Sequence, residues 1–129
     1  MANNYLELST MLKVQTPEER AWLEAELKIL EEKSELTYEP MGFDYEFEKD
    51  GLWIHGENAT PELVADLIQK FLAKFHPDKF FIFSWAYYCD KPRLDEFGGG
   101  AAIVRAGGYE TIDAMGEMQK LLSEWGEAL

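Results

Sequence analysis

The chain has 129 residues and a formal net charge of −13 at pH 7, with 47% hydrophobic and 14% aromatic residues. This length and apolar content suffice for a single domain, residues 1–129, with a buried core, and they exclude a disordered acidic tail. A negative field of this size repels nucleic acid, anionic membranes and acidic substrates, and it attracts basic surfaces.

The excess of negative charge is concentrated in the first half of the chain. Residues 16–57 hold thirteen Asp and Glu against four Lys and Arg, a net charge of −9, whereas residues 60–79 are balanced at three against three. A single cysteine, Cys89, excludes an intramolecular disulfide and fits a reducing compartment. No apolar run approaches the roughly 20 residues needed to span a bilayer, and the first residues lack the pattern of a signal peptide. We therefore expect a cytoplasmic protein.

The first elements are a strand and a helix. Alternation over residues 5–10 predicts a short strand. Thr16, Pro17 and Glu19 then form a helix start, because Thr16 can cap the helix and Glu19 completes a capping box. The helix is predicted to run to about Lys33, with Trp22, Leu23, Leu27 and Leu30 on its buried side. The acidic residues Glu24, Glu31 and Glu35 lie on the exposed side.

A β-hairpin is predicted next. Apolar and acidic residues alternate over 43–48, Asp50-Gly51 is a strong two-residue turn signal, and residues 52–56 return as the second strand. With this turn, Phe47 pairs with Ile54, Glu48 with Trp53 and Glu46 with His55.

The second half begins with a helix from Thr60 to just before Pro77. Residues 79–88 are the most apolar stretch and predict a central strand covered on both faces. A loop follows over residues 89–100, then a strand over 101–106, a break at Gly107-Gly108, and a last helix. This helix is expected over residues 111–125, burying Ile112, Met115, Leu122 and Trp125.

The expected order is β-α-β-β-α-β-β-α. Short connections between paired strands favour hairpins. We therefore predict an α+β fold, in which three helices pack on a mostly antiparallel sheet of four to five strands.

The acidic ladder of Asp44, Glu46 and Glu48 is the sharpest sequence feature. Alternate residues on a strand lie roughly 6.6–6.8 Å apart, near the phosphate spacing of an extended nucleic-acid strand. The ladder could therefore imitate a phosphate track, with Glu24, Glu31 and Glu35 extending it and Trp53 serving as an aromatic anchor. The alternative is an ordinary solvated strand face, although like charges in a row repel one another.

The sequence offers little for catalysis or metal binding. His55 opposite Glu46 has suitable ligand types, but no HxH, HxxxH or HExxH spacing supports a metal site. The acidic neighbour of Cys89 raises the pKa of a thiol, and no nucleophile, base and oxyanion donor assemble. We expect no enzyme activity, no metal and no cofactor.

The loop over residues 89–100 supplies a second candidate site. Its ligand-binding residues are Lys91, Arg93, Glu96, Phe97, Gly98 and Gly99, which could hold an anionic ligand or a peptide. The glycines lead into a strand without a following Lys-Ser/Thr, so this is not a Walker phosphate loop. The alternative is a hairpin loop satisfied by its own turn residues.

The same loop carries a resemblance. Residues 91–93 (Lys-Pro-Arg) and 96–101 (Glu-Phe-Gly-Gly-Gly-Ala) resemble a stretch in small acidic bacterial and phage proteins of no known function. Residues 2–6, 16–23 and 69–72 are similar to these proteins as well, and this chain is shorter between the first helix and the hairpin. The resemblance implies a compact intracellular protein of phages, plasmids or their hosts, and it assigns no catalytic residues.

These observations lead to two hypotheses. The first is a non-enzymatic acidic interaction protein that binds a basic surface, such as that of a nucleic-acid-binding protein, and does not bind nucleic acid or membrane. Its narrower form is a nucleic-acid-mimicking inhibitor or anti-defence protein of a mobile element. The second is a small binding module that uses the loop Lys91–Gly100. A homodimer through the first helix or an apolar outer strand remains open.

Overall fold

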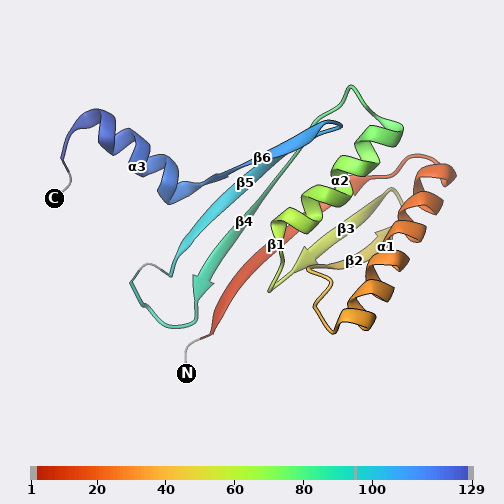
Figure 1. Ribbon diagram of the computed structural model, residues 1–129, viewed down its shortest axis with the longest axis horizontal. Coiled ribbons are helices and arrows are strands. Elements are labelled where there is room, and N and C mark those ends of the chain that lie inside the picture. The colour runs from red at the N-terminus through yellow and green to blue at the C-terminus, as the bar shows by residue number, and fades with distance from the viewer. Residues whose placement is uncertain (1–2, 95, 128–129) are drawn as a thin grey trace.

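The computed structural model describes residues 3–94 and 96–127. Its elements are β1 (Asn4–Lys13), α1 (Pro17–Thr37), β2 (Asp44–Glu48), β3 (Gly51–Gly56), α2 (Pro61–Phe75), β4 (Phe81–Cys89), β5 (Gly98–Arg105), β6 (Gly108–Asp113) and α3 (Ala114–Trp125). The strands form one antiparallel sheet in the order β2-β3-β1-β4-β5-β6 (Figure 1). The predicted α+β class is confirmed, but the sheet has six strands rather than four to five.

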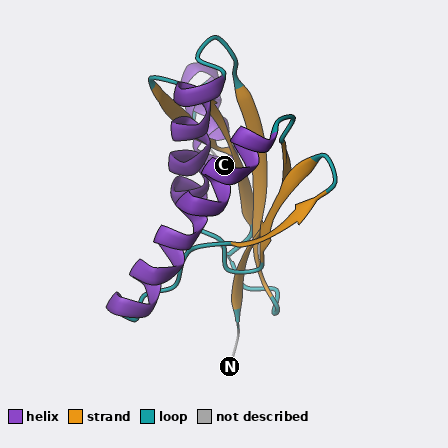
Figure 2. Ribbon diagram, turned by 90° about the vertical axis from the view of Figure 1, so that its right-hand side faces the viewer, coloured by secondary structure: helices purple, strands orange, loops and turns teal. Residues whose placement is uncertain are grey.

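The first six elements form two interlocked βαβ units. In β1-α1-β2, the strand β3 lies between the two parallel strands, and in β3-α2-β4 the strand β1 does so. This is the split βαβ arrangement of ferredoxin-like folds, to which β5 and β6 add two further strands. The helices α1 and α2 lie on one face of the sheet (Figure 2). We call the opposite face the open face.

The core lies between the sheet and these two helices. Leu23 and Leu27 of α1 are fully buried, as are Val64 and Ile68 of α2. They pack against inward-facing strand residues, which include Leu8, Leu12, Leu52, Ile54, Phe83, Ala102 and Val104. The predicted buried side of the first helix is therefore confirmed, although Trp22 and Leu30 are only half-buried.

The C-terminal region differs from the prediction. Residues 111–113, expected in the last helix, belong to β6, which pairs with β5 through a turn at Ala106-Gly107. The helix α3 begins only at Ala114, and Asp113 caps it by accepting a hydrogen bond from the Gly116 N–H at 3.0 Å. None of its described residues is buried, and Ile112 on β6 is 53% exposed, so the expected burial of Ile112, Met115, Leu122 and Trp125 was wrong.

The hairpin β2-β3 has a different register from the one predicted. Phe47 pairs with Leu52, Glu46 with Trp53 and Asp44 with His55, a shift of two residues. The turn is Lys49-Asp50, and Gly51 already belongs to β3. A Cβ at Gly51 would lie 2.8 Å from Met11 Sδ and 2.9 Å from the Leu12 carbonyl oxygen. Gly51 is therefore required by the close approach of β1, and not by the turn.

The strand β4 was expected to be covered on both faces, and this was wrong. Phe83 is buried under the helices, whereas Ile82 is 69% exposed on the open face. The alternation itself is as predicted. Because β5 begins at Gly98 and β4 ends at Cys89, the connection between them is also shorter than expected.

A buried carboxylate joins the two helices. Glu19 is 2% exposed, and its Oε2 lies 2.9 Å from His76 Nε2 at the end of α2. Its Oε1 accepts hydrogen bonds from the Gln15 N–H and the Thr16 hydroxyl, and the Glu19 N–H donates to Thr16 Oγ1. The Thr16 half of the predicted capping box is therefore present, whereas the Glu19 side chain bonds the Gln15 N–H and the Thr16 hydroxyl in place of the Thr16 N–H. His76 is a further partner of Glu19. Burial opposes ionisation, but hydrogen bonds from His76, Thr16 and Gln15 outweigh it and lower the pKa of Glu19.

This arrangement predicts acid sensitivity. Because the pKa of Glu19 in the folded state lies below its ordinary value of 4.5, its contribution to stability is present above that pH and is lost as pH falls through the folded pKa. Urea unfolding at pH 7 should show that His76→Ala costs about 1–2 kcal/mol. Glu19→Gln should flatten the loss of stability below pH 4.5; an unchanged acid profile would contradict this role.

Candidate interaction site on the open face

The acidic ladder lies on the open face at one edge of the sheet. Asp44, Glu46 and Glu48 are exposed along β2, whereas Tyr45 and Phe47 point toward the helices and are half-buried. In the register of the hairpin, Trp53 lies beside Glu46 and His55 beside Asp44, on the same face. The ladder therefore borders an aromatic pair on the next strand.

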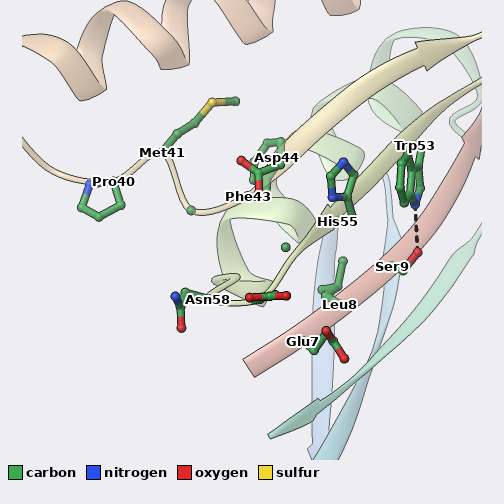
Figure 3. Close-up of a pocket in the computed structure, with 13 residues that line it drawn as sticks. Glu7, Leu8, Ser9, Pro40, Met41, Phe43, Asp44, Trp53, His55 and Asn58 are labelled. Atoms are coloured by element: carbon green, nitrogen blue, oxygen red, sulfur yellow. Dashed lines mark hydrogen bonds between the residues drawn. The ribbon is translucent and has the colours of Figure 1, made fainter. Parts of the chain in front are cut away.

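Trp53 and His55 are held in a fixed arrangement. Their rings are stacked, with centroids 3.8 Å apart and an interplanar angle of 24°. The indole Nε1–H of Trp53 donates a hydrogen bond of 2.8 Å to Ser9 Oγ on β1 (Figure 3). His55 Nε2 is shielded from solvent and has no hydrogen-bond partner within the described residues, and Glu46 Oε2 lies 3.9 Å away.

A hollow of about 670 Å³ opens beside this pair. The residues around it come from β1, from β2 and the segment before it, and from β3 and the segment after it: Glu7, Leu8, Ser9, Pro40, Met41, Gly42, Phe43, Asp44, Trp53, His55, Gly56, Glu57 and Asn58 (Figure 3). Gly42 shapes one wall with a φ of +100°. Its carbonyl accepts a hydrogen bond of 2.7 Å from the Thr60 N–H at the start of α2.

Three carboxylates surround this hollow. Glu7 comes from β1, Asp44 from β2 and Glu57 from the segment after β3. Glu57 is positioned by its carbonyl, which accepts a hydrogen bond from the Leu6 N–H. Partial burial and the nearby Glu7 and Glu57 raise the pKa of Tyr88, as expected where negative charges gather. Within the described residues, no Lys or Arg forms an ion pair with these carboxylates or with Glu46 and Glu48.

The predicted carboxylates of the first helix lie in the other layer. Glu31 accepts a hydrogen bond from the Tyr45 hydroxyl on the helix-covered side of β2, which raises the pKa of Tyr45 to about 12 together with burial. Glu24 pairs with Arg20 at 3.1 Å, and Glu35 is exposed near the end of α1. The structure therefore brings Asp44, Glu46 and Glu48 together with Trp53, but it does not place the helix residues on the same face.

His55 and Glu46 are the potential metal ligands that the sequence places opposite each other. Across residues 3–94 and 96–127, no three His, Cys, Asp or Glu side chains are close enough to hold a metal ion. The pair of His55 and Glu46 is thus one imidazole and one carboxylate at a separation too long for a hydrogen bond.

The residues proposed as a second site are divided between the connection after β4 and the first residues of β5. Lys91 and Arg93 are exposed, as is Phe97, and Glu96 is half-buried. Gly98 and Gly100 lie beneath aromatic rings, because a Cβ at these positions would overlap Tyr87 and Trp85. Gly99 sits between them, and its Cβ would lie 3.0 Å from the Trp85 carbonyl oxygen. The glycines thus pack the sheet rather than present free backbone to a ligand.

The surroundings of Cys89 favour the protonated thiol. Its side chain is buried, and burial together with hydrogen bonding to Glu96 raises the pKa of the thiol. A thiol held neutral in this way is a poor nucleophile.

Sequence reasoning missed several residues of the site. Ser9, Glu7 and Glu57 come from segments that carry no strong local pattern. The available signal was the alternation in β1, which places Glu7 and Ser9 on one face, but only the strand order sets that face beside Trp53.

Comparisons of the chain with protein-family models, with curated proteins and with solved structures give no match. None of the helices in the described part of the chain is long and apolar enough to cross a membrane.

Proposed function

We propose that this chain is a non-enzymatic interaction protein that binds a basic protein surface. The binding site is the acidic face, which consists of Glu7, Asp44, Glu46, Glu48, Glu57, Trp53 and His55. The observation that carries the proposal is the gathering of these carboxylates around a hollow with a rigid aromatic pair, where no described Lys or Arg forms an ion pair with them. Carboxylates attract the partner's lysines and arginines, and a rigid tryptophan supplies contact area at low entropic cost.

The charge on this face argues against nucleic acid as the partner. In RNA-binding domains with a four-stranded sheet of this kind, aromatic side chains on the sheet stack on bases. This chain has comparable aromatics on the two middle strands of the β2-β3-β1-β4 part of its sheet, Tyr5 on β1 and Trp53 on β3. However, carboxylates flank them where a nucleic acid would need positive charge. A face of this shape and sign suits a partner that is itself basic.

A narrower form of the proposal is mimicry of nucleic acid. Three carboxylates at alternate positions of β2 repeat at roughly 6.6–6.8 Å, close to the spacing of extended phosphates. A partner that normally holds DNA or RNA in a basic groove would then accept the edge of this sheet. An inhibitor or anti-defence protein of a mobile element would act in this way.

The proposal is tested by capturing partners on the immobilised chain from lysate of the cells that make it. Capture should fall by roughly tenfold or more between about 0.05 M and 0.5 M salt, because salt screens exposed charge pairs. Excess duplex DNA or RNA should displace the captured protein if the mimicry form is right. Capture that is indifferent to salt contradicts the proposal, and displacement by neither nucleic acid contradicts only its narrower form.

A further inference from the structure

The helix α3 is amphipathic, yet no element in the described part of the chain covers its apolar side. Its twelve residues carry a stripe at helical spacing in which every side chain is 39–84% exposed: Met115, Met118, Leu121, Leu122 and Trp125. A helix of this length is marginal in water without tertiary packing. The exposed stripe therefore points to a covering surface outside this copy of the chain.

The connection to β6 holds α3 away from its own sheet. Asp113 is both the last residue of β6 and the N-cap of α3, so no linker separates the two elements. One Asp113 oxygen accepts from the Gly116 N–H, and the other lies 3.4 Å from the Tyr87 hydroxyl. Without a flexible linker, α3 continues beyond the end of β6, as Figure 1 shows. Folding it back over the sheet would break this cap.

The open face has an uncovered apolar patch on the half away from the acidic ladder. Ile82 on β4 pairs with Ile103 on β5, and these side chains are 69% and 43% exposed. Phe80, just before β4, is 67% exposed, and Ile112 on β6 is 53% exposed. We call these four residues the isoleucine patch. Patches of exposed large apolar side chains in one place mark interaction surfaces.

The total surface supports the same conclusion. A compact monomer of 14.9 kDa is expected to expose roughly 7,000 Å². This chain exposes 9002 Å², an excess of about 2,000 Å². A standard interface takes roughly 800 Å² from each partner, so the excess is ample for a stable dimer.

We propose that a second copy of this chain is the missing cover, with α3 of each copy packed on the isoleucine patch of the other. In the described part of the chain, the apolar side of α3 packs on no sheet, and no helix covers the isoleucine patch. Two copies can therefore cover these surfaces for each other by reciprocal exchange. Most of the negative charge lies in residues 16–57, outside both surfaces, so the two copies can approach there with little repulsion. A membrane is a poorer occupant, because the polar side of α3 has Glu117 and Glu124 against one lysine, Lys120. This proposal is independent of the acidic face.

The first test is the mass of the chain in solution by sedimentation equilibrium over a range of concentrations. Wild type should be a dimer. A helix variant, Met118→Asp/Leu122→Asp, and a patch variant, Ile82→Asp/Ile103→Asp, should each be monomeric. Leu36→Asp is the matched control, because Leu36 is 82% exposed at the end of α1 and should remain dimeric when charged. Far-UV circular dichroism checks that each variant is folded.

Mixing the two variants tests the arrangement itself. The helix of the patch variant and the patch of the helix variant are both intact, so an equimolar mixture should regain a dimer held by one of the two contacts. A dimer of helix against helix, or of patch against patch, would not be restored by mixing, and that result overturns the proposal. A monomeric wild type overturns the proposal as well. Binding of that monomer to neutral lipid vesicles would not restore it.

A measurement on the unmodified surface guards against variants that fail to fold. Trp125 is 84% exposed in the single chain and lies in the proposed contact. Its fluorescence, obtained as the difference between wild type and Trp125→Phe, should shift to shorter wavelength as concentration rises through the range in which sedimentation shows monomer converting to dimer. A spectrum that does not change across that range would count against the dimer.

Discussion

Neutralising the ladder with Asp44→Asn, Glu46→Gln and Glu48→Gln is expected to weaken capture of a basic partner by roughly threefold to 150-fold. The range follows from the loss of three exposed charge pairs, each of which contributes only modestly to the binding free energy. The change keeps the size of every side chain, so packing and fold should be unaffected. The loss should be largest at low salt and should shrink as salt rises, since the removed term is electrostatic.

The matched control places the same change of charge in the other layer. Glu24→Gln, Glu31→Gln and Glu35→Gln remove three charges from α1, which lies on the covered side of the sheet. This variant should lose much less affinity than the ladder variant. Equal losses would mean that net charge alone drives binding and that the acidic face has no special part. Because the ladder lies outside the isoleucine patch, capture of a basic partner and the mass of the dimer can be measured independently of each other.

Gly100→Ala is expected to destabilise the fold by about 1–3 kcal/mol, or roughly 5–15 °C in Tm. A Cβ there would lie 2.5 Å from Trp85 Cζ2 on one side and 2.7 Å from the Ile112 carbonyl oxygen on the other. The ring can move only by disturbing its packing against Phe83, and the carbonyl belongs to β6. Neither neighbour can move away without a loss of stability, so thermal unfolding should show the strain as a lower Tm.

Gly107→Ala is the control for this prediction. Gly107 lies in the turn before β6, nothing surrounds a Cβ there within 4 Å, and its φ is not in the left-handed region. Alanine at this position should leave stability unchanged or raise it slightly, because it restricts the unfolded chain. If both variants unfold alike, the packing of Trp85 over Gly100 is not what requires the glycine.

Local patterns were enough to predict several features of the fold. The capping residues Thr16 and Thr60 precede helices that start where the sequence places them, at Pro17 and Pro61. The faces of β2 and β4 followed from the two-residue period of a strand. This inference survived the wrong hairpin register, because a shift of two residues leaves every side chain on its original face. The ladder and Trp53 were therefore correctly expected on one face.

Other features depend on contacts between distant segments. The register of β2 and β3 follows from β1, whose Met11 and Leu12 leave no room for a side chain at position 51. The strand β6 was missed because residues 108–113 have a weak pattern, and pairing with β5 is what makes them a strand. Similarly, the bond between Glu19 and His76 joins residues 57 positions apart.

The amino-acid sequence is sufficient to predict which side chains share a strand face or a helix side, because the backbone sets these periods within a few residues. Which of these faces are covered depends on the packed fold. The helices α1 and α2 both lie on one face of the sheet, so the apolar residues Ile82 and Ile103 on the open face remain exposed. On the same open face, Glu7 and Glu57 join the ladder around one hollow. Coverage depends on strand order and on the direction in which α3 leaves the sheet, and neither is a local property of the chain.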